Sequence, residues 1–311
     1  MTRIVVTGGA GRLGRSLVSG LADAGNEIVS LDRAHPAGFA RDGVDAVDID
    51  LSDADAAASA LRDARADALI HLAAIAVPFS APEDVILRTN AGLAASVLGG
   101  AVDAGIGRIV AASSPTVLGY GAPSGWAPVR FPLDEDTPPR PWNAYALSKL
   151  VIEQAVQMYA RQTGDAVRFA SFRPCYVIAP EEWAGAPTQQ GHTVRERLDD
   201  PSLSAPAVFN YVDARDVADF CDRLLDAMAV GDVPNAETFF VGADDALARE
   251  PLADLVPQYF PGTERAAAVL TGTAPAFSNA KARRLLGWSP SRSWRTELPA
   301  PVAEIVASAR P

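Results

Sequence analysis

The 311-residue chain has few of the residues that disulfide frameworks and metal sites require. It contains two cysteines, Cys175 and Cys221, and three histidines. Two cysteines give no disulfide framework, and no group of Cys and His has the spacing of a metal site. We therefore predict no bound metal and no disulfide framework. The chain enters an apolar segment at once, without a signal peptide, so the cytoplasm is the expected location.

Positive charge and long apolar runs are also scarce. Lys and Arg number 27 against 38 Asp and Glu, which gives a net charge of −11. Because nucleic-acid affinity depends on neutralising phosphates, nucleic acid is excluded as a partner. No apolar run approaches the roughly 18 residues of a membrane helix, so no membrane span is expected. The length suits one large α/β unit with a smaller lobe, and a small molecule is the expected partner.

The N-terminal segment has the pattern of a dinucleotide-binding turn. An apolar strand at 4–6 runs into Gly8-x-x-Gly11-x-x-Gly14, and residues 12–24 follow with the spacing of a helix. Gly8 can make the tight turn, Gly11 lets the backbone approach a pyrophosphate, and Gly14 lets the helix pack closely. The free N–H groups of the helix favour phosphate. We predict cofactor contacts at Gly8, Gly11, Arg12, Leu13 and Gly14; an ordinary glycine-rich turn is the alternative.

The next two predicted strands end in acidic residues. The strand at 27–31 ends at Asp32, where a carboxylate can bind the ribose hydroxyls of the cofactor and repel a 2′-phosphate. This favours NAD over NADP, although Arg33 beside it keeps NADP open. The strand at 45–49 ends at Asp50-Leu51, near the expected adenine. Asp50 could equally begin the helix predicted at 52–64.

Strands and helices alternate through the first 170 residues or so. Further strands are predicted at 68–72, 108–112 and 167–172, and further helices at 82–104 and 145–162. This alternation predicts an α/β fold with a doubly wound parallel sheet. Its ligand is expected at the carboxyl ends of the strands. The residues at those ends are Gly8, Asp32, Asp50, Ala73-Ala74 and Ser113-Ser114.

The rest of the chain is less regular. Gly119–Asn143 holds six prolines and is predicted to form a long loop over the site. A second irregular stretch is expected at 180–206, helices at 212–228 and 281–286, and a strand at 237–241. We predict a cofactor-binding domain of residues 1–174 and 208–243, and a substrate-binding lobe of residues 175–207 and 244–311.

Tyr145 and Lys149 lie four residues apart on a predicted helix and so share a face. A phenol of pKa about 10 is a weak base at neutral pH. A nearby ammonium and the positive charge of a nicotinamide favour the phenolate, which can take the proton of a substrate hydroxyl. Ser114 can hold the same oxygen. We predict Ser114, Tyr145 and Lys149 as the catalytic set; an exposed Tyr and Lys at a helix start is the alternative.

Together these motifs resemble the NAD-dependent epimerase/dehydratase family of extended short-chain dehydrogenases/reductases. The resemblance is carried by Thr7–Gly14, Asp32, Asp50-Leu51, His71–Ala74, Asn90, Ser113-Ser114, Asp134-Glu135, Tyr145–Lys149, Glu153, Arg173-Pro174, Tyr211–Asp213, Asp216–Ala218 and Leu286–Trp288.

The resemblance implies a Rossmann-type domain that holds NAD(P), with Tyr145 as acid/base and Lys149 on the nicotinamide ribose. The expected cofactor contacts beyond the glycine turn are Asp32, Asp50, Leu51, Ala73, Ala74, Asn90, Tyr145, Lys149 and Pro174. The expected substrate contacts are Ser114, Thr116, Cys175 and Tyr176. His71 is expected to be structural. The helices at 82–104 and 145–162 would pair two copies in a homodimer.

The chain also departs from its relatives. Sugar-nucleotide dehydratases carry Asp-Glu where this chain has Pro115-Thr116, so the second acid/base that elimination needs is missing. Uronate dehydrogenases, whose compact lobe is similar, carry Asn-His there. Many nucleotide-sugar epimerases have asparagine where this chain has Tyr176, and arginine where it has Phe209-Asn210. The chain therefore has fewer arginines that could bind a diphosphate than these relatives have. The remaining candidates are Arg195, Arg197 and Arg292.

Three functions remain. The first is an NAD-dependent oxidoreductase that acts on a secondary alcohol or ketone of a sugar-like molecule, with Tyr145 as acid/base. The second is an NAD-dependent sugar or nucleotide-sugar epimerase, which oxidises and re-reduces its substrate on a retained cofactor. The third is a non-catalytic binder that senses NAD(P), which the complete catalytic set disfavours.

Overall fold

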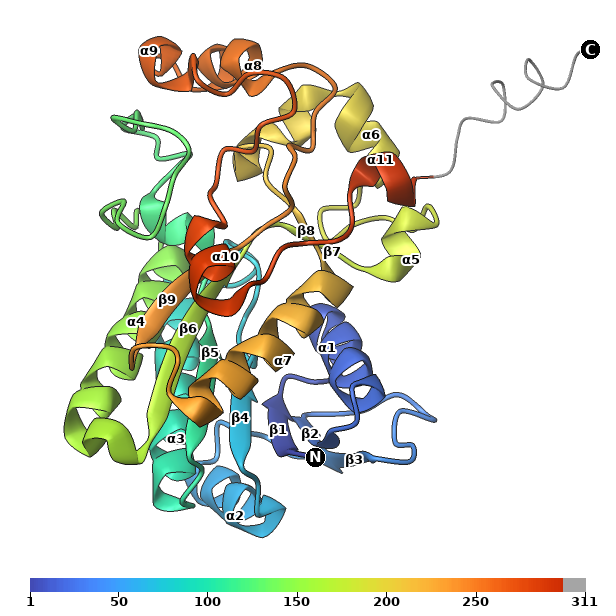
Figure 1. The fold of residues 1–311 in the computed structure, drawn as a ribbon, viewed down its shortest axis with the longest axis vertical. Helices are drawn as coiled ribbons and strands as arrows, with labels where there is room; N and C mark the ends of the chain where they lie inside the picture. Colours follow the sequence, from blue (N-terminus) through green and yellow to red (C-terminus); the bar gives the residue numbers. More distant parts are fainter. Residues whose placement is uncertain (299–311) are drawn as a thin grey trace, which may run out of the picture.

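The computed structural model describes residues 1–298, and the last part of the predicted substrate lobe, 299–311, lies outside the described residues. Seven parallel strands form the central sheet, in the order β3-β2-β1-β4-β5-β6-β9 (Figure 1). They are β1 (Arg3–Thr7), β2 (Glu27–Asp32), β3 (Val44–Asp48), β4 (Ala68–His71), β5 (Arg108–Ala112), β6 (Arg168–Pro174) and β9 (Glu237–Val241). The predicted doubly wound parallel sheet is confirmed.

Helices cover both faces of this sheet. On one face lie α1 (Arg12–Asp23) and α7 (Ala214–Val230), which pack side by side. On the other lie α2 (Ala54–Ala64), α3 (Glu83–Asp103) and α4 (Ala144–Thr163), with α3 between its two neighbours. Each layer has its own apolar core against the strands. Strands β1, β2, β4, β5 and β6 are buried on both faces over most of their length, which explains why they read as largely apolar runs in the sequence, whereas the edge strand β3 is mostly exposed.

The connecting elements are short. Those before α7 are the 3₁₀ turns Pro115–Leu118, Gly164–Ala166, Pro201–Leu203 and Ala205–Ala207, the strands β7 (Val177–Ile178) and β8 (Val212–Asp213), and the helices α5 (Pro180–Trp183) and α6 (Val194–Asp199). Those after β9 are α8 (Leu252–Tyr259), α9 (Glu264–Ala267), α10 (Ala280–Leu286) and α11 (Trp294–Glu297).

Two predictions in this part of the chain were wrong. The stretch 180–206 is not irregular throughout, because it contains α5 and α6. A capping box begins α6, in which Thr193 and Glu196 bond each other's backbone N–H groups, and this Thr-x-x-Glu pattern is a helix signal. The helix predicted from Val212 begins two residues later, since Asp213 caps α7 by accepting from the Arg215 N–H at 2.7 Å.

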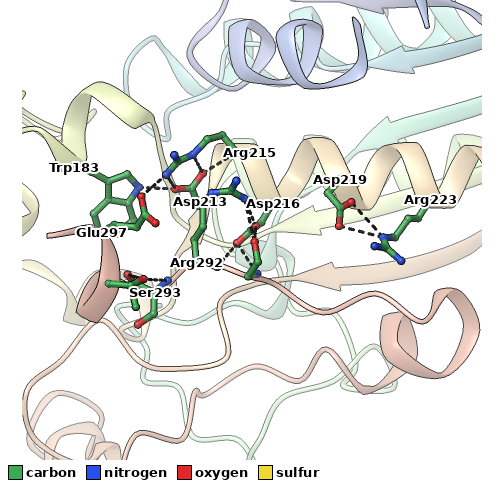
Figure 2. A network of polar contacts seen from close by, with 11 residues as sticks. Trp183, Asp213, Arg215, Asp216, Asp219, Arg223, Arg292, Ser293 and Glu297 are labelled. Carbon is green, nitrogen blue, oxygen red and sulfur yellow. Dashed lines mark hydrogen bonds and ion pairs between the residues drawn. The ribbon is translucent and has the colours of Figure 1, made fainter. Parts of the chain in front are cut away.

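Buried carboxylates at the start of α7 tie distant segments together (Figure 2). Asp213 accepts from Trp183 of α5 at 2.7 Å and from Arg215, which also reaches Glu297 of α11. One turn later, Asp216 accepts from the backbone N–H of Arg292 at 3.0 Å and from its guanidinium at 2.6 Å. The first turn of α7 therefore holds both α5 and the segment before α11.

Among residues 1–298, α3 is long and apolar enough to cross a membrane by length and composition alone, with a mean hydropathy of 1.4 over its apolar window. The search of the sequence for apolar runs overlooked this helix, and the absence of a membrane span stays a prediction. A third of that window is buried inside the structure (33%), where α3 packs on the sheet and on both neighbouring helices. One helix of this kind is weak evidence for a membrane, because core helices of soluble proteins share its composition.

Candidate active site

A cavity of about 740 Å³ opens at the carboxyl ends of the strands. It lies beside β1 and β4, where the strand order reverses, as expected for a ligand site in a doubly wound sheet. It is lined by every predicted cofactor and substrate residue except one: Gly8, Gly11, Arg12, Leu13, Gly14, Asp32, Asp50, Leu51, Ala73, Ala74, Ser114, Thr116, Tyr145, Lys149, Pro174, Cys175 and Tyr176.

The glycine turn is built as a cradle without side chains. Gly8 has φ +73°, and a Cβ there would lie 2.8 Å from the backbone nitrogen of Ala73. A Cβ on Gly14 would lie 2.2 Å from the carbonyl oxygen of Gly8. Helix α1 begins beside the cavity with Gly11 at its N-cap, and no side chain bonds its first N–H groups. This donor set fits the pyrophosphate of a dinucleotide.

Asp32 is held in place at the end of β2. Its carboxylate accepts from the backbone N–H of Ala10 at 3.0 Å and from that of Arg33 at 2.8 Å. Both Asp32 and Arg33 line the cavity. Asp50 does not begin α2, because Asp53 is the residue that caps it. Hydrogen bonds from Ser52 instead lower the pKa of Asp50.

Helix α4 presents Tyr145 and Lys149 from its first two turns. Its N-terminus is fixed twice: Asn143 accepts from the Ala146 N–H at 2.8 Å, and Glu83 of α3 accepts from the Ala144 N–H at 2.6 Å. Burial raises the pKa of the Tyr145 phenol to about 12, and a hydrogen bond with Ser114 works in the opposite direction. Burial lowers the pKa of Lys149 to about 8. Its Nζ donates to the Ala112 carbonyl at 3.0 Å.

Ser114 follows β5 and lies beside the Tyr145 phenol. Its hydroxyl oxygen accepts from the Thr116 hydroxyl at 2.9 Å and from the Thr116 backbone N–H at 3.3 Å. With both donors supplied by Thr116, the Ser114 hydroxyl hydrogen is free to point toward Tyr145 or a substrate oxygen. Thr116 therefore supports Ser114 from behind, although both residues line the cavity.

A buried network holds α4 against the sheet. The Glu153 carboxylate accepts from the Ser113 hydroxyl at 2.6 Å and from the Arg173 guanidinium at 2.8 and 2.9 Å. Glu153 lies one turn after Lys149, and Ser113 also donates to the Lys149 carbonyl at 3.4 Å. Ser113 is thus a packing neighbour of the catalytic set. The network sets the distance of α4 from β5 and β6.

Asn90 is the one predicted contact that does not line the cavity. Its side-chain amide lies behind the wall, where it accepts from the Ile75 N–H at 2.7 Å and donates to the Ser148 hydroxyl at 3.0 Å. It therefore ties the loop after β4 to α4. This position comes from the packing of α3 on α4, which the local sequence does not reveal.

His71 is buried at the end of β4, between the glycine turn and Lys149. Its Nδ1 lies 2.8 Å from the hydroxyl of Thr7, whose oxygen already accepts from the Leu72 N–H at 3.2 Å. The direction of the bond between Thr7 and His71 depends on the tautomer of the ring, because a hydroxyl both donates and accepts. Burial and the charge of Lys149 lower the pKa of His71 to about 3, so the ring is neutral at physiological pH. A neutral, sheet-facing ring suits the structural role that was expected.

The structure adds cavity residues that the sequence motifs missed. They include Tyr120, Gln189, Gln190 and Asn210, together with apolar residues of the loop after β4. Tyr120 follows the Ser114 turn, and burial raises the pKa of its phenol. No periodic signal marks these positions, because they come from loops that only the fold brings to the strand ends.

The proline-rich segment 119–143 does not cover the cavity as predicted, since Tyr120 is its one lining residue. Leu133 donates its N–H to the Ala276 carbonyl at 2.7 Å, and the Trp126 ring lies 5.2 Å from that of Phe260. The segment therefore packs on the C-terminal part of the chain. Its aromatic side chains pack against apolar residues of that part, and the composition of the segment does not reveal these contacts.

Comparison with known proteins agrees with this site. Residues 4–242 match the NAD dependent epimerase/dehydratase family. The chain belongs to that family. It is therefore an enzyme of the extended short-chain dehydrogenase/reductase type, within a family whose members depend on NAD.

Individual relatives carry different activities in their names. The chain is 35% identical over 164 residues to a UDP-glucose 4-epimerase of Azospirillum brasilense, over 50% of this chain and 44% of that protein. It thus spans less than half of that relative. It is 30% identical to an L-arabinose 1-dehydrogenase (NAD(P)(+)) of Haloferax volcanii, over 64% of this chain and 72% of that one.

Solved structures share the fold. A short-chain dehydrogenase/reductase superfamily protein of Agrobacterium tumefaciens with bound NAD superposes with a TM-score of 0.69 at 23% identity, covering 99% of this chain and 96% of that one. At this identity the likeness concerns the fold alone.

Proposed function

We propose that this protein is an NAD-dependent oxidoreductase that transfers a hydride between a secondary alcohol or ketone of a sugar-like molecule and the nicotinamide. The observation that carries the proposal is the presence of Ser114, Tyr145 and Lys149 in the same cavity as a side-chain-free glycine cradle. When bound, the cofactor supplies the hydride acceptor or donor. Everything else in the reaction falls to the residues of this chain.

In the proposed reaction, Tyr145 takes the proton from the substrate hydroxyl during oxidation and returns it during reduction. Because burial holds the Tyr145 pKa near 12, the phenol needs positive charge nearby to act as a base at neutral pH. The Lys149 ammonium supplies part of that charge. Ser114 holds the substrate oxygen within reach of the phenol, and Asp32 binds the ribose hydroxyls, which favours NAD over NADP.

A dehydrogenase is favoured over an epimerase by the shape of the substrate side. An epimerase of nucleotide sugars must hold a diphosphate, which calls for several arginines. Tyr176 and Asn210 both line the cavity. In such relatives asparagine is expected in place of Tyr176, and arginine in place of Phe209-Asn210. Arg292 is committed to Asp216.

The epimerase is the second candidate, because several relatives carry that name, with identities up to 35%. The two differ in how they hold the cofactor. An epimerase re-reduces its own intermediate and therefore needs a retained cofactor, whereas a dehydrogenase must exchange it after each turnover.

The decisive measurement is the nucleotide content of the purified protein after denaturation. We expect substoichiometric nucleotide and reversible binding of added NAD, followed by NAD reduction with a panel of sugars and sugar acids. Near-stoichiometric NAD that survives purification would support the epimerase instead. Failure to bind either NAD or NADP would overturn both.

A further inference from the structure

Two arginines from distant parts of the chain meet at one tyrosine of the cavity wall. The guanidinium carbon of Arg12, in the glycine turn, lies 5.7 Å from the ring centroid of Tyr176. That of Arg197, in α6, lies 4.2 Å from the same centroid. Tyr176 follows the end of β6 and lines the cavity. This corner therefore carries two positive charges next to the site.

The two arginines differ in how they are paired. Arg12 donates to both carboxylate oxygens of Glu182, to the Val177 carbonyl and to Gln189. Among residues 1–298, the Arg197 guanidinium has one hydrogen-bond partner, the side-chain oxygen of Gln190, which its Nη1 reaches at 2.6 Å. No carboxylate in the described part of the chain forms an ion pair with it. Glu182 balances one of the two charges, so the corner keeps a net charge of +1.

Arg197 is buried in spite of this. The residue is 1% exposed, and its Nε and Nη2 have no hydrogen-bond partner among residues 1–298. The hydroxyl of Tyr176 is also buried without a partner. A buried charge without a counter-charge is strongly unfavourable, and unpaired buried donors add to that cost. Such a cluster is expected where a ligand supplies the missing anion.

Gln190 is in the position of a replaceable partner. Its side chain is exposed and lines the cavity, and its amide oxygen accepts from Nη1 of Arg197, which does not itself line the cavity. Gln190 therefore separates Arg197 from the site. When an exposed glutamine turns away, a carboxylate oxygen can take its place at Nη1. The planar guanidinium can then offer Nη2 to the second oxygen, since carboxylate and guanidinium pair as two parallel bonds.

We propose that Arg197 binds a carboxylate of the substrate, with Gln190 as the partner that it displaces and the Tyr176 hydroxyl as a second donor. The substrate class is then a sugar-like acid. One carboxylate neutralises the net charge of +1 at this corner, whereas a diphosphate would leave an excess of negative charge. The inference rests on the proposed function, because it places this acid beside Tyr145 and the cofactor.

The test is calorimetric titration of the NAD-loaded Tyr145→Phe protein, in which the proposed mechanism slows turnover by about 10²–10⁴-fold. The probes are D-glucuronate, D-galacturonate and D-mannuronate, each paired with its neutral hexose, and the 6-phosphate of each hexose. We expect at least one acid to bind about 10- to 100-fold more tightly than its neutral hexose, the range for hydrogen bonds to a charged group.

Two variants identify the site. Arg197→Met should remove the advantage of the acid over the neutral sugar. Gln190→Glu should do the same without touching the buried core, because it places a carboxylate of the chain against Arg197. The matched control is Arg249→Met, which removes an exposed charge that pairs with Asp199 on the same α6 and should leave the advantage intact.

Each other outcome overturns the inference. Equal binding of acid and hexose does so, as does an advantage that survives both variants, tighter binding of a phosphate than of any acid, or no binding of any acid. A loss of NAD affinity in Arg197→Met would mean that Arg197 binds the cofactor and not the substrate. NAD binding is measured first on each protein, so its absence from the wild type contradicts the proposed function and not this site alone.

Discussion

The ammonium of Lys149 lies 5.8 Å from the ring centroid of Tyr145, one turn earlier on α4. No carboxylate in residues 1–298 pairs with this ammonium, and its one hydrogen bond is to the Ala112 carbonyl. Burial moves the two pKa values apart: it raises that of the phenol from 10.0 to about 12 and lowers that of the amine from 10.5 to about 8. In both groups burial favours the neutral form. The pair is therefore poised to respond to a third charge, which the oxidised nicotinamide supplies.

Replacing Tyr145 by Phe removes the proton acceptor while leaving the ring in its packing. We expect the rate of NAD reduction to fall by about 10²–10⁴-fold, the usual contribution of general acid–base catalysis. The dissociation constant for NAD should change little. Ser114→Ala should cause a smaller loss, because the phenol that exchanges the proton remains. Turnover at the wild-type rate in Tyr145→Phe would contradict the proposed mechanism.

The pH dependence should report Lys149. Since its pKa in the folded protein is about 8, the ammonium is present below that pH and is lost above it. We expect kcat/KM for NAD reduction to decline on the alkaline side with an apparent pKa near 8 that belongs to the coupled Tyr145–Lys149 pair. In Lys149→Arg the decline should move above about pH 10, because guanidinium stays protonated. An unchanged profile in that variant would assign the decline to another group.

The same shift has a consequence for stability. The folded pKa of Lys149 lies below its ordinary value of 10.5, so between pH 8 and 10.5 the unfolded chain binds more protons at this residue. Its contribution to the free energy of unfolding should therefore rise with pH across this window. Urea unfolding of the wild type and of Lys149→Met, compared at both ends of the window, isolates the contribution of Lys149. A difference in the free energy of unfolding that does not vary with pH would contradict this prediction.

Asp32 should set the preference for NAD. Its carboxylate is fixed by two backbone N–H groups at the end of β2, where it would repel a 2′-phosphate. In Asp32→Ser we expect the ratio of kcat/KM for NAD over NADP to fall by about 10- to 100-fold, the value of hydrogen bonds to a charged group. Arg33→Ala serves as the opposite control and should raise the ratio. No change in either variant would place the adenosine ribose elsewhere.

The Glu153–Arg173 pair should matter for stability far more than any surface pair. Both side chains are buried, at 7% and 4% exposure, and Glu153→Gln leaves an uncompensated guanidinium. We expect a loss of about 3–5 kcal/mol in the free energy of unfolding by urea. Asp84→Asn breaks an exposed pair with Arg88 and should cost less than about 1 kcal/mol. Similar losses in the two variants would contradict the structural role of the network.

We also propose that two copies pair through α3 and α4. Leu147 and Met158 of α4 are 40% and 44% exposed, and α3 beside them is apolar over most of its length. Leu147→Glu with Met158→Glu should shift a dimer to monomer in sedimentation, because a charge in an apolar interface is strongly unfavourable. The control Val230→Glu changes an exposed apolar residue on α7 and should not. A wild-type monomer would contradict the pairing.

The sequence by itself determined the sheet, the cofactor turn and the residues at the strand ends. Strand and helix periods are local properties, and only glycine fits the turn at Gly8 and Gly14 because neighbouring backbone fills the space of a side chain. Parallel strands then bring their carboxyl ends to one edge. For this reason Asp32, Ser114, Tyr145 and Lys149 could be placed beside one cavity before any contact was known.

Only the tertiary structure decided which side chains reach that cavity from elsewhere. Asn90 turned out to lie behind the wall, the proline-rich segment packed on the C-terminal part, and Arg197 was singled out among three candidate arginines. Each result depends on contacts between residues far apart in the chain, such as Arg12 with Glu182, 170 positions away. Local propensity carries no information on such pairs, since burial and charge are properties of the packed chain.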